Sequence, residues 1–166
     1  MRELWDVYDI HREKTGKVHE RGKPLIKGEY YLVVNIWIMD SNNRILLTKR
    51  HHKKTWGNYW ECTGGFVQKG EDSLQGAVRE VSEEIGIRLN EKEGILLSQG
   101  CKDNYLIDTW IFKKDIKISE LIFQYGEVID AKLVDEKEYK EMCREKLVTP
   151  NARNFHNLYY NSMKNK

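Results

Sequence analysis

The sequence predicts an α+β domain in which helices pack on a mixed β-sheet. Short runs of β-branched and aromatic residues, typical of strands, are interspersed with segments of helical periodicity, and no regular βαβ repeat occurs. The length of 166 residues is enough for one domain and hardly two. Because no repeat, low-complexity tract or proline- and serine-rich linker divides the chain, we expect residues 1–166 to form a single domain.

Strands are predicted where apolar residues cluster or alternate between turn residues. The run from Tyr30 to Met39 is long, β-branched and aromatic, and is expected to be a central strand. After a turn at residues 40–43, Ile45 to Arg50 is expected to return as its hairpin partner. Residues 13–16 are expected to turn, and residues 17–28 to be irregular. The other predicted strands are residues 5–9, 60–66, 96–99, 105–112 and 128–134.

Three segments have the features of helices. Between residues 74 and 85, apolar side chains recur at i, i+3, i+4, i+7 and i+11, which forms one stripe on a helix, and Gly86 follows as the C-cap glycine. Asp135 is expected to cap a second helix, with Glu138 three residues on. Thr149-Pro150 is expected to open a third, because proline is favoured in a first turn.

Composition excludes several classes of protein. Apolar residues make up 40% and charged residues 33%, which supports a packed core. The net charge of +2 gives no general attraction to nucleic acid, and no apolar stretch approaches the roughly 20 residues of a membrane span. Three widely spaced cysteines, and charges where a signal peptide needs an apolar run, predict a reducing, cytoplasmic setting. The oligomeric state stays open.

Three glutamates gather on the first predicted helix. Glu80, Glu83 and Glu84 stand at i, i+3 and i+4, so their carboxylates share a face that lies away from the apolar stripe. Taken alone, they are compatible with an ordinary solvated face. Like charges at these spacings repel by a few tenths of a kcal/mol each. A bound cation would turn that repulsion into attraction, and oxygen ligands suit Mg²⁺ or Mn²⁺.

The spacing of residues before these glutamates changes the interpretation. The chain reads Gly65, five residues, Glu71, seven residues, Arg79-Glu80-Val81, one residue, Glu83-Glu84, one residue, Gly86-Ile87. This segment resembles the Nudix box at every specified position, a match expected by chance at about one in 10⁹ starting points. Residues 46–50 and 56–60 also resemble the family's approach to the box.

The resemblance implies a fold and a reaction. The Nudix fold is a mixed sheet sandwiched between helices in α/β/α layers. The implied reaction is metal-dependent cleavage of a diphosphate linkage in a nucleoside diphosphate derivative or a nucleoside di- or triphosphate. Mg²⁺ or Mn²⁺ would neutralise the phosphates and lower the pKa of a bound water, a carboxylate would remove its proton, and an in-line displacement at phosphorus would complete the cut.

The resemblance also assigns roles to residues. Glu80, Glu83 and Glu84 are the expected metal ligands, and Glu71 is expected to anchor the loop and to reach the metal through water. Glu80 or Glu83 is the expected general base, and Arg79 is expected to orient a catalytic carboxylate.

Residues outside the box helix are expected to assist. Glu127, in a Glu-Val pair before a strand, is expected to help catalysis, although a plain loop carboxylate is an equal alternative. Arg50 is an expected phosphate contact. The bend at Gly64-Gly65 is expected to let a phosphate approach the backbone. Aromatic residues that could stack on a base, or belong to the core or a lid, are Tyr30, Tyr31, Trp56, Tyr59, Trp60 and Tyr105.

Two other functions stay open within the same fold. The N-terminal half also resembles isopentenyl-diphosphate isomerase, which moves a proton across an allylic diphosphate with an essential cysteine and metal-binding histidines. That cysteine would fall at Gly64, Cys62 lies two residues away, and the histidine pattern is not retained. A non-catalytic Nudix-fold nucleotide-binding module is the second alternative, but such modules usually lose box glutamates and this chain keeps them.

Overall fold

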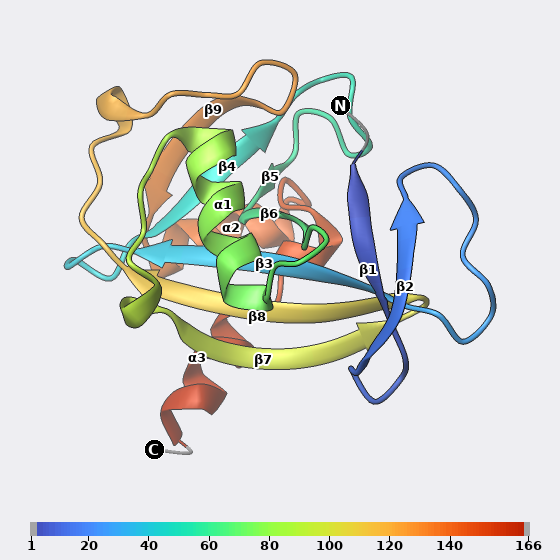
Figure 1. Cartoon of the computed structure of the whole chain (residues 1–166). Coiled ribbons are helices and arrows are strands. Elements are labelled where there is room, and N and C mark those ends of the chain that lie inside the picture. The colour runs from blue at the N-terminus through green and yellow to red at the C-terminus, as the bar shows by residue number, and fades with distance from the viewer. Residues whose placement is uncertain (1–2, 165–166) are drawn as a thin grey trace.

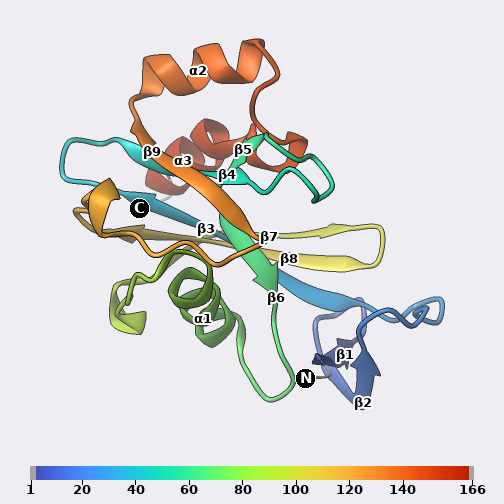
Figure 2. The ribbon, with the colours of Figure 1, turned by 90° about the horizontal axis from the view of Figure 1, so that it is seen from above.

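The fold is built from one mixed β-sheet with helices on both faces. The computed structural model describes residues 3–164, and side chains for residues 3–162. Helix α1 (Ser73–Ile85) covers one face, and α2 (Glu136–Arg144) and α3 (Phe155–Lys164) lie on the other (Figure 2). The expected α+β class and its α/β/α layers are therefore confirmed.

Strands from distant parts of the chain form the sheet (Figure 1). Its central path runs β5-β4-β3-β8-β7, with β6 paired to β3 and β9 paired to β4. The pairing of β3 with β8 is parallel and joins Tyr31 to Tyr105 and Met39 to Lys113, whereas the other pairings are antiparallel. The strands are β3 (Tyr31–Met39), β4 (Ile45–Arg50), β5 (Trp60–Glu61), β6 (Thr63–Phe66), β7 (Ile95–Lys102), β8 (Tyr105–Lys113) and β9 (Val128–Val134).

The prediction that β4 pairs with β3 as a hairpin is wrong except next to the turn that joins them. The two strands pair only at Met39 and Ile45. Along the rest of its length β4 pairs with β9 and β5, and β3 pairs with β6 on one side and β8 on the other. Both edges of β3 therefore pair with strands, β6 and β8, that do not follow β3 directly in the sequence.

Two hydrophobic cores hold the layers together. Between α1 and the sheet, Val34, Ile36 and Ile38 of β3 pack with Ala77 and Val81 of α1. On the opposite face Trp37 and Leu47 pack with residues of α2 and α3, which include Tyr139 and Phe155. Successive residues of β3 thus point to opposite cores, because side chains alternate along a strand.

A separate two-stranded sheet lies beside the ends of β3 and β8 (Figure 1). It joins β1 (Leu4–Tyr8) to β2 (Lys14–Glu20) in antiparallel register. The prediction of a turn at residues 13–16 and an irregular segment at residues 17–28 is wrong over residues 14–20, which form β2. This strand is mostly exposed and polar, so it lacks the apolar alternation that identifies a strand, and its backbone pairing with β1 defines it instead.

The helix ends follow the expected signals with one exception. Asp72 caps α1 through a capping box with Gln75, and Gly86 ends it in the left-handed conformation at φ 75°. Asp135 caps α2 through the backbone N–H of Glu138. Pro150 opens a short 3₁₀ turn, η3 (Pro150–Ala152), and α3 begins only at Phe155.

Two further 3₁₀ turns lie in the connections. They are η1 (Glu91–Glu93), before β7, and η2 (Ile118–Glu120), between β8 and β9. Within the described part of the chain, no helix is long and apolar enough to cross a membrane.

Candidate active site

One groove collects nearly all of the side chains expected at the site. It has a volume of ≈ 350 Å³ and lies between α1, β6 and the loops that follow β4 and η2. Only Glu71, among the expected residues, does not line it. Those that do are Arg50, Gly64, Gly65, Arg79, Glu80, Glu83, Glu84 and Glu127.

Arg79 ties the box together. Its Nε and Nη2 donate to the two carboxylate oxygens of Glu71 at 2.7 and 3.0 Å. Its Nη1 donates to Glu80 at 2.8 Å and to Glu83 at 3.0 Å, and Nη2 also donates to the carbonyl oxygen of Phe66 at 2.8 Å. Although burial opposes the charge, hydrogen bonds to Glu71 and Glu80 raise the pKa of Arg79. One guanidinium therefore sets the positions of three carboxylates.

Glu71 lies behind this arginine. Besides the two bonds from Arg79, its carboxylate accepts a hydrogen bond from the backbone N–H of Gln68 at 2.9 Å. The helix cap is the next residue, Asp72. Glu71 is thus placed to brace the loop between β6 and α1.

The three glutamates of α1 lie in different environments. Glu84 is 7% exposed, and burial, followed by the negative charge of Glu80, raises its pKa to about 8. Burial also raises the pKa of Glu80, against the opposing charge of Arg79. The side chain of Glu83 is 48% exposed. Negative charge is therefore costly at Glu80 and Glu84, and a cation in the groove would lower that cost.

The donor set fits a hard divalent cation. Carboxylate oxygens are the ligands that Mg²⁺ and Mn²⁺ prefer. Within residues 3–164, however, no three acidic, histidine or cysteine side chains converge closely enough to hold a metal ion. Arg79 is bonded to both Glu80 and Glu83, so a cation must use their other oxygens or take the place of the guanidinium.

The two glycines allow close contacts that a side chain would block. A Cβ on Gly64 would lie 2.5 Å from the carbonyl oxygen of Val34 in the adjacent strand. A Cβ on Gly65 would lie 2.3 Å from Cδ of Glu80. Gly64 therefore allows β6 to pair with β3, and Gly65 makes room for the Glu80 carboxylate.

Two cations of the groove are held by carboxylates. Arg50 donates to Glu61 at 2.5 Å and to the carbonyl oxygen of Thr55 at 2.8 Å. Lys54 forms an ion pair with Glu127. Burial raises the pKa of Glu61 against the opposing charge of Arg50. Glu61 and Lys54 were not expected here, because no motif marks them as partners.

The N-terminal hairpin also reaches the groove. Glu3, just before β1, and Arg21, just after β2, line it and form an ion pair at 2.7 Å. Sequence reasoning missed both, since Arg21 lies in a segment expected to be irregular and neither belongs to the box.

A larger cavity of ≈ 580 Å³ adjoins the groove. The two share Arg50, Gly64, Gly65 and Phe66. Two of the expected stacking candidates, Trp56 and Tyr105, line this cavity, and Trp56 is 49% exposed. The groove and the larger cavity therefore form one continuous space, large enough for a small molecule.

Comparisons with known proteins find relatives of this chain. A family model described as NUDIX domain matches residues 29–157. An uncharacterized Nudix hydrolase of Listeria monocytogenes is 37% identical over 147 residues, which cover 84% of each chain. The isopentenyl-diphosphate Delta-isomerase of Pectobacterium atrosepticum is 32% identical over 84 residues, 49% of this chain and 46% of that one.

Solved structures share the fold. A crystal structure of a Deinococcus radiodurans protein has a TM-score of 0.71 at 18% identity, and the similarity covers 89% of this chain and 92% of that one. At this identity the match concerns the architecture alone.

Proposed function

Since this chain belongs to the Nudix hydrolase family, and is a pyrophosphohydrolase, we propose that it is metal-dependent and cuts a nucleotide diphosphate linkage. The substrate class is a nucleoside diphosphate derivative or a nucleoside di- or triphosphate. The observation that carries the proposal is the groove in which Glu80, Glu83 and Glu84 meet Glu127.

The metal site of the proposal is the face of α1. Glu80, Glu83 and Glu84 would hold Mg²⁺ or Mn²⁺, and Glu71, which accepts two hydrogen bonds from Arg79, would contribute at a distance. When bound, the metal neutralises phosphate charge and makes water acidic. Support comes from the burial of the Glu80 and Glu84 carboxyl groups, which raises the pKa of both and makes their negative charge costly unless a cation lies beside them.

The chain's own groups then manage the proton. Glu80 or Glu83 accepts it from the attacking water, and Arg79 fixes both carboxylates. Burial raises the pKa of Glu80 in the metal-free protein, so this carboxylate takes up a proton more readily than an exposed glutamate does before metal binds. Glu127, which lines the groove just before β9, assists once the substrate's phosphates compete for Lys54.

Substrate binding is assigned to the junction of groove and cavity. Arg50 contacts a phosphate, and the backbone at Gly64-Gly65 lets that phosphate approach. The larger cavity accepts the nucleoside or its substituent. The free cysteines, with Cys101 exposed, support the cytoplasmic setting of the proposal.

Isomerase chemistry lacks support from the cysteine nearest the site. Cys62 is 6% exposed among apolar side chains, and burial raises the pKa of its thiol. At neutral pH it is a buried, protonated thiol. Gly64 stands where the isomerase cysteine would fall.

A coupled phosphate-release screen tests the proposal: added alkaline phosphatase frees phosphate from the monoesters that cleavage of a diphosphate derivative leaves, and pyrophosphatase frees it from the pyrophosphate that cleavage of a triphosphate leaves. Purified protein is assayed with nucleoside diphosphate derivatives and nucleoside di- and triphosphates, with Mg²⁺, Mn²⁺ or EDTA. We expect metal-dependent turnover that falls by about 100-fold or more in Glu83→Gln. Glu138→Gln, an exposed glutamate on α2, is the matched control and keeps wild-type turnover. Unchanged turnover in Glu83→Gln would overturn the metal assignment.

A further inference from the structure

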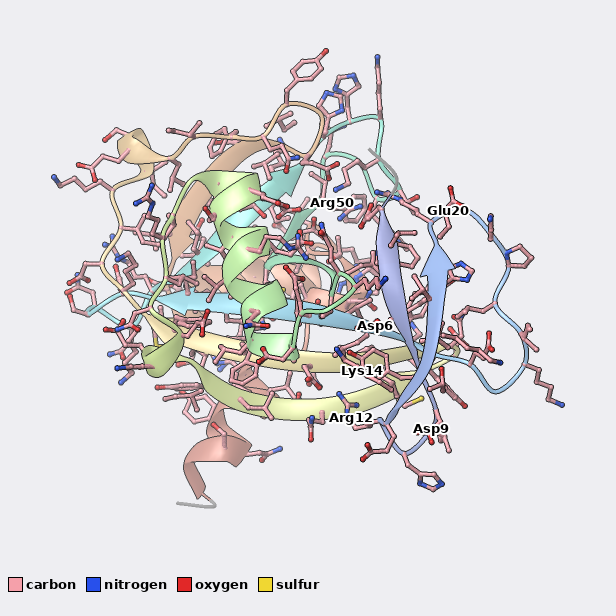
Figure 3. The ribbon with its side chains drawn as sticks, in the orientation of Figure 1. Asp6, Asp9, Arg12, Lys14, Glu20 and Arg50 are labelled. Carbon is pink, nitrogen blue, oxygen red and sulfur yellow. The ribbon has the colours of Figure 1, made fainter. Side chains whose placement is uncertain are left out.

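The N-terminal hairpin holds the loop that leads into α1. The Asp6 carboxylate on β1 accepts hydrogen bonds from the backbone N–H of Gly70 at 2.9 Å and from Nζ of Lys14 at 2.8 Å. Lys14, on β2, also donates to the carbonyl oxygen of Glu71 at 3.0 Å. Asp6 and Lys14 thus bind two successive backbone groups of the same turn (Figure 3).

The N-terminal hairpin holds this turn at three places, in addition to the turn's own hydrogen bond from the backbone N–H of Glu71 to the carbonyl oxygen of Gln68 at 3.1 Å. Gly70 is exposed and has φ +88°, a conformation that other residues rarely adopt. A third contact joins the backbone N–H of Lys69 to the carbonyl oxygen of Leu4 at 2.8 Å. Although burial opposes its charge, bonds from Lys14 and Gly70 lower the pKa of Asp6. Asp6 and Lys14, which together we call the clamp, are therefore an ion pair at neutral pH.

A continuous set of contacts leads from this turn to the box glutamates. Glu71 belongs to the turn, and its carboxylate receives two hydrogen bonds from Arg79. Arg79 in turn bonds Glu80 and Glu83. A shift of the Glu71 backbone consequently moves the group that positions both glutamates.

The hairpin is itself firmly attached to the sheet. Tyr8 and Tyr30 exchange two backbone hydrogen bonds of 2.9 Å. Arg12, in the hairpin turn, forms an ion pair with buried Asp108 of β8. Trp5 stacks on Phe66, with ring centroids 4.2 Å apart. Because it is anchored at these places, the hairpin can act as a rigid support.

We propose that Asp6 and Lys14 are positioning residues of the active site. They fix the turn at Gly70-Glu71, and through Arg79 they fix Glu80 and Glu83. The hairpin lies outside residues 29–157, so this support is an addition to the matched domain. The expected effect of the clamp on turnover rests on the proposed hydrolysis, whereas its effect on the position of the turn and of Arg79 does not.

The test removes the cation of the clamp and keeps the hairpin. Lys14→Met deletes both hydrogen bonds, and Lys14→Arg restores donors to the same acceptors. Lys17→Met is the matched control, because Lys17 lies on the same strand, is exposed, and pairs with Glu29 away from the loop. Circular dichroism and urea unfolding establish that all three variants fold.

Two measurements decide the proposal. The first is the solvent exchange of Gly70 N–H and Arg79 Nε–H in nuclear magnetic resonance spectra, which needs no substrate. We expect both to exchange about 10-fold faster in Lys14→Met and at wild-type rates in the other two variants. The second is turnover: kcat falls on the order of 10-fold in Lys14→Met with KM within about twofold, and Lys14→Arg recovers most of it.

The outcomes separate this inference from the proposed function. Wild-type protein that lacks metal-dependent turnover refutes the hydrolysis, and the exchange rates still decide whether the clamp exists. If Lys14→Met leaves the Arg79 Nε–H exchange rate and kcat at wild-type values, the clamp is wrong. An equal loss in Lys17→Met overturns it as well, since the effect would then reflect hairpin charge in general.

Discussion

Replacing Gly65 with alanine tests how closely catalysis depends on the position of Glu80. An ideal Cβ at this position would lie 2.3 Å from Cδ of Glu80 and 2.4 and 2.5 Å from its carboxylate oxygens. The backbone of Gly65 is not in the left-handed region, so alanine is allowed by the main chain. The carboxylate of Glu80 is the group that must give way.

The size of the effect follows from that distance. To reach an ordinary van der Waals separation of 3.4 Å, the carboxylate must move by about 1 Å, which disturbs its bond to Arg79. A displacement of about 1 Å costs about 100-fold in rate, equivalent to about 2.7 kcal/mol of transition-state stabilisation. The free energy of unfolding should change by about 1 kcal/mol or less, because a flexible side chain absorbs the contact.

Steady-state kinetics with Mg²⁺, combined with urea unfolding, measures both quantities. Gly100→Ala is the control, because a Cβ there meets nothing within 4 Å. A Gly65→Ala variant that keeps kcat within about threefold of wild type would refute the assignment of Glu80. A loss of kcat matched by global unfolding would instead contradict the expected small change in the free energy of unfolding.

Three further variants test the electrostatics and the chemistry of the site. Burial raises the pKa of Glu84 from 4.5 to about 8, so the folded state holds a proton that the unfolded chain releases, and wild-type stability falls as pH rises between these values. In EDTA we therefore expect Glu84→Gln to unfold at a higher urea concentration than wild type. The difference in the free energy of unfolding between the two proteins should grow between pH 5 and pH 8 to about 3 kcal/mol. An equal difference at both pH values would contradict this expectation. Arg79→Lys cannot bond Glu71 at two points while reaching Glu80, so kcat should fall by about 30-fold or more and the free energy of unfolding by about 1 kcal/mol, measured by the same two assays. Cys62→Ala should keep hydrolysis within about twofold in the phosphate-release assay, because the buried thiol lies outside the proposed reaction. Loss of all turnover in a folded variant would show that the thiol takes part in the reaction.

Local sequence signals were sufficient to predict the helices that carry the site. The apolar stripe and the C-cap glycine identify α1, and Asp135 identifies the start of α2. These signals work because capping and periodicity depend on residues within one or two turns. The spacing of the box residues predicted that Arg79 and the glutamates act together, and Arg79 does bond Glu80 and Glu83, while their catalytic and metal-binding roles stay predictions.

Pairings between distant segments could not be predicted in the same way. The polar strand β2 is defined by its partner β1, and β4 leaves β3 for β9 after a single residue pair. The ion pair of Arg50 with Glu61 depends on the pairing of β4 with β5. Such contacts are decided by which strands meet in space, and one sequence carries no local record of that.

The parallel pairing of β3 with β8 also limits how early the groove can form while the chain is being synthesised. By the time Glu84 leaves the ribosome, every residue of the box has been made. Yet β3 has no partner on one edge until β8, which ends at Lys113, has emerged, and Glu127 follows later still. Non-local pairing of this kind must wait for loop closure, so it forms slowly. A nascent chain therefore contains the full set of box carboxylates well before they share a groove. Fragments that end ahead of β8 should be unable to form this groove.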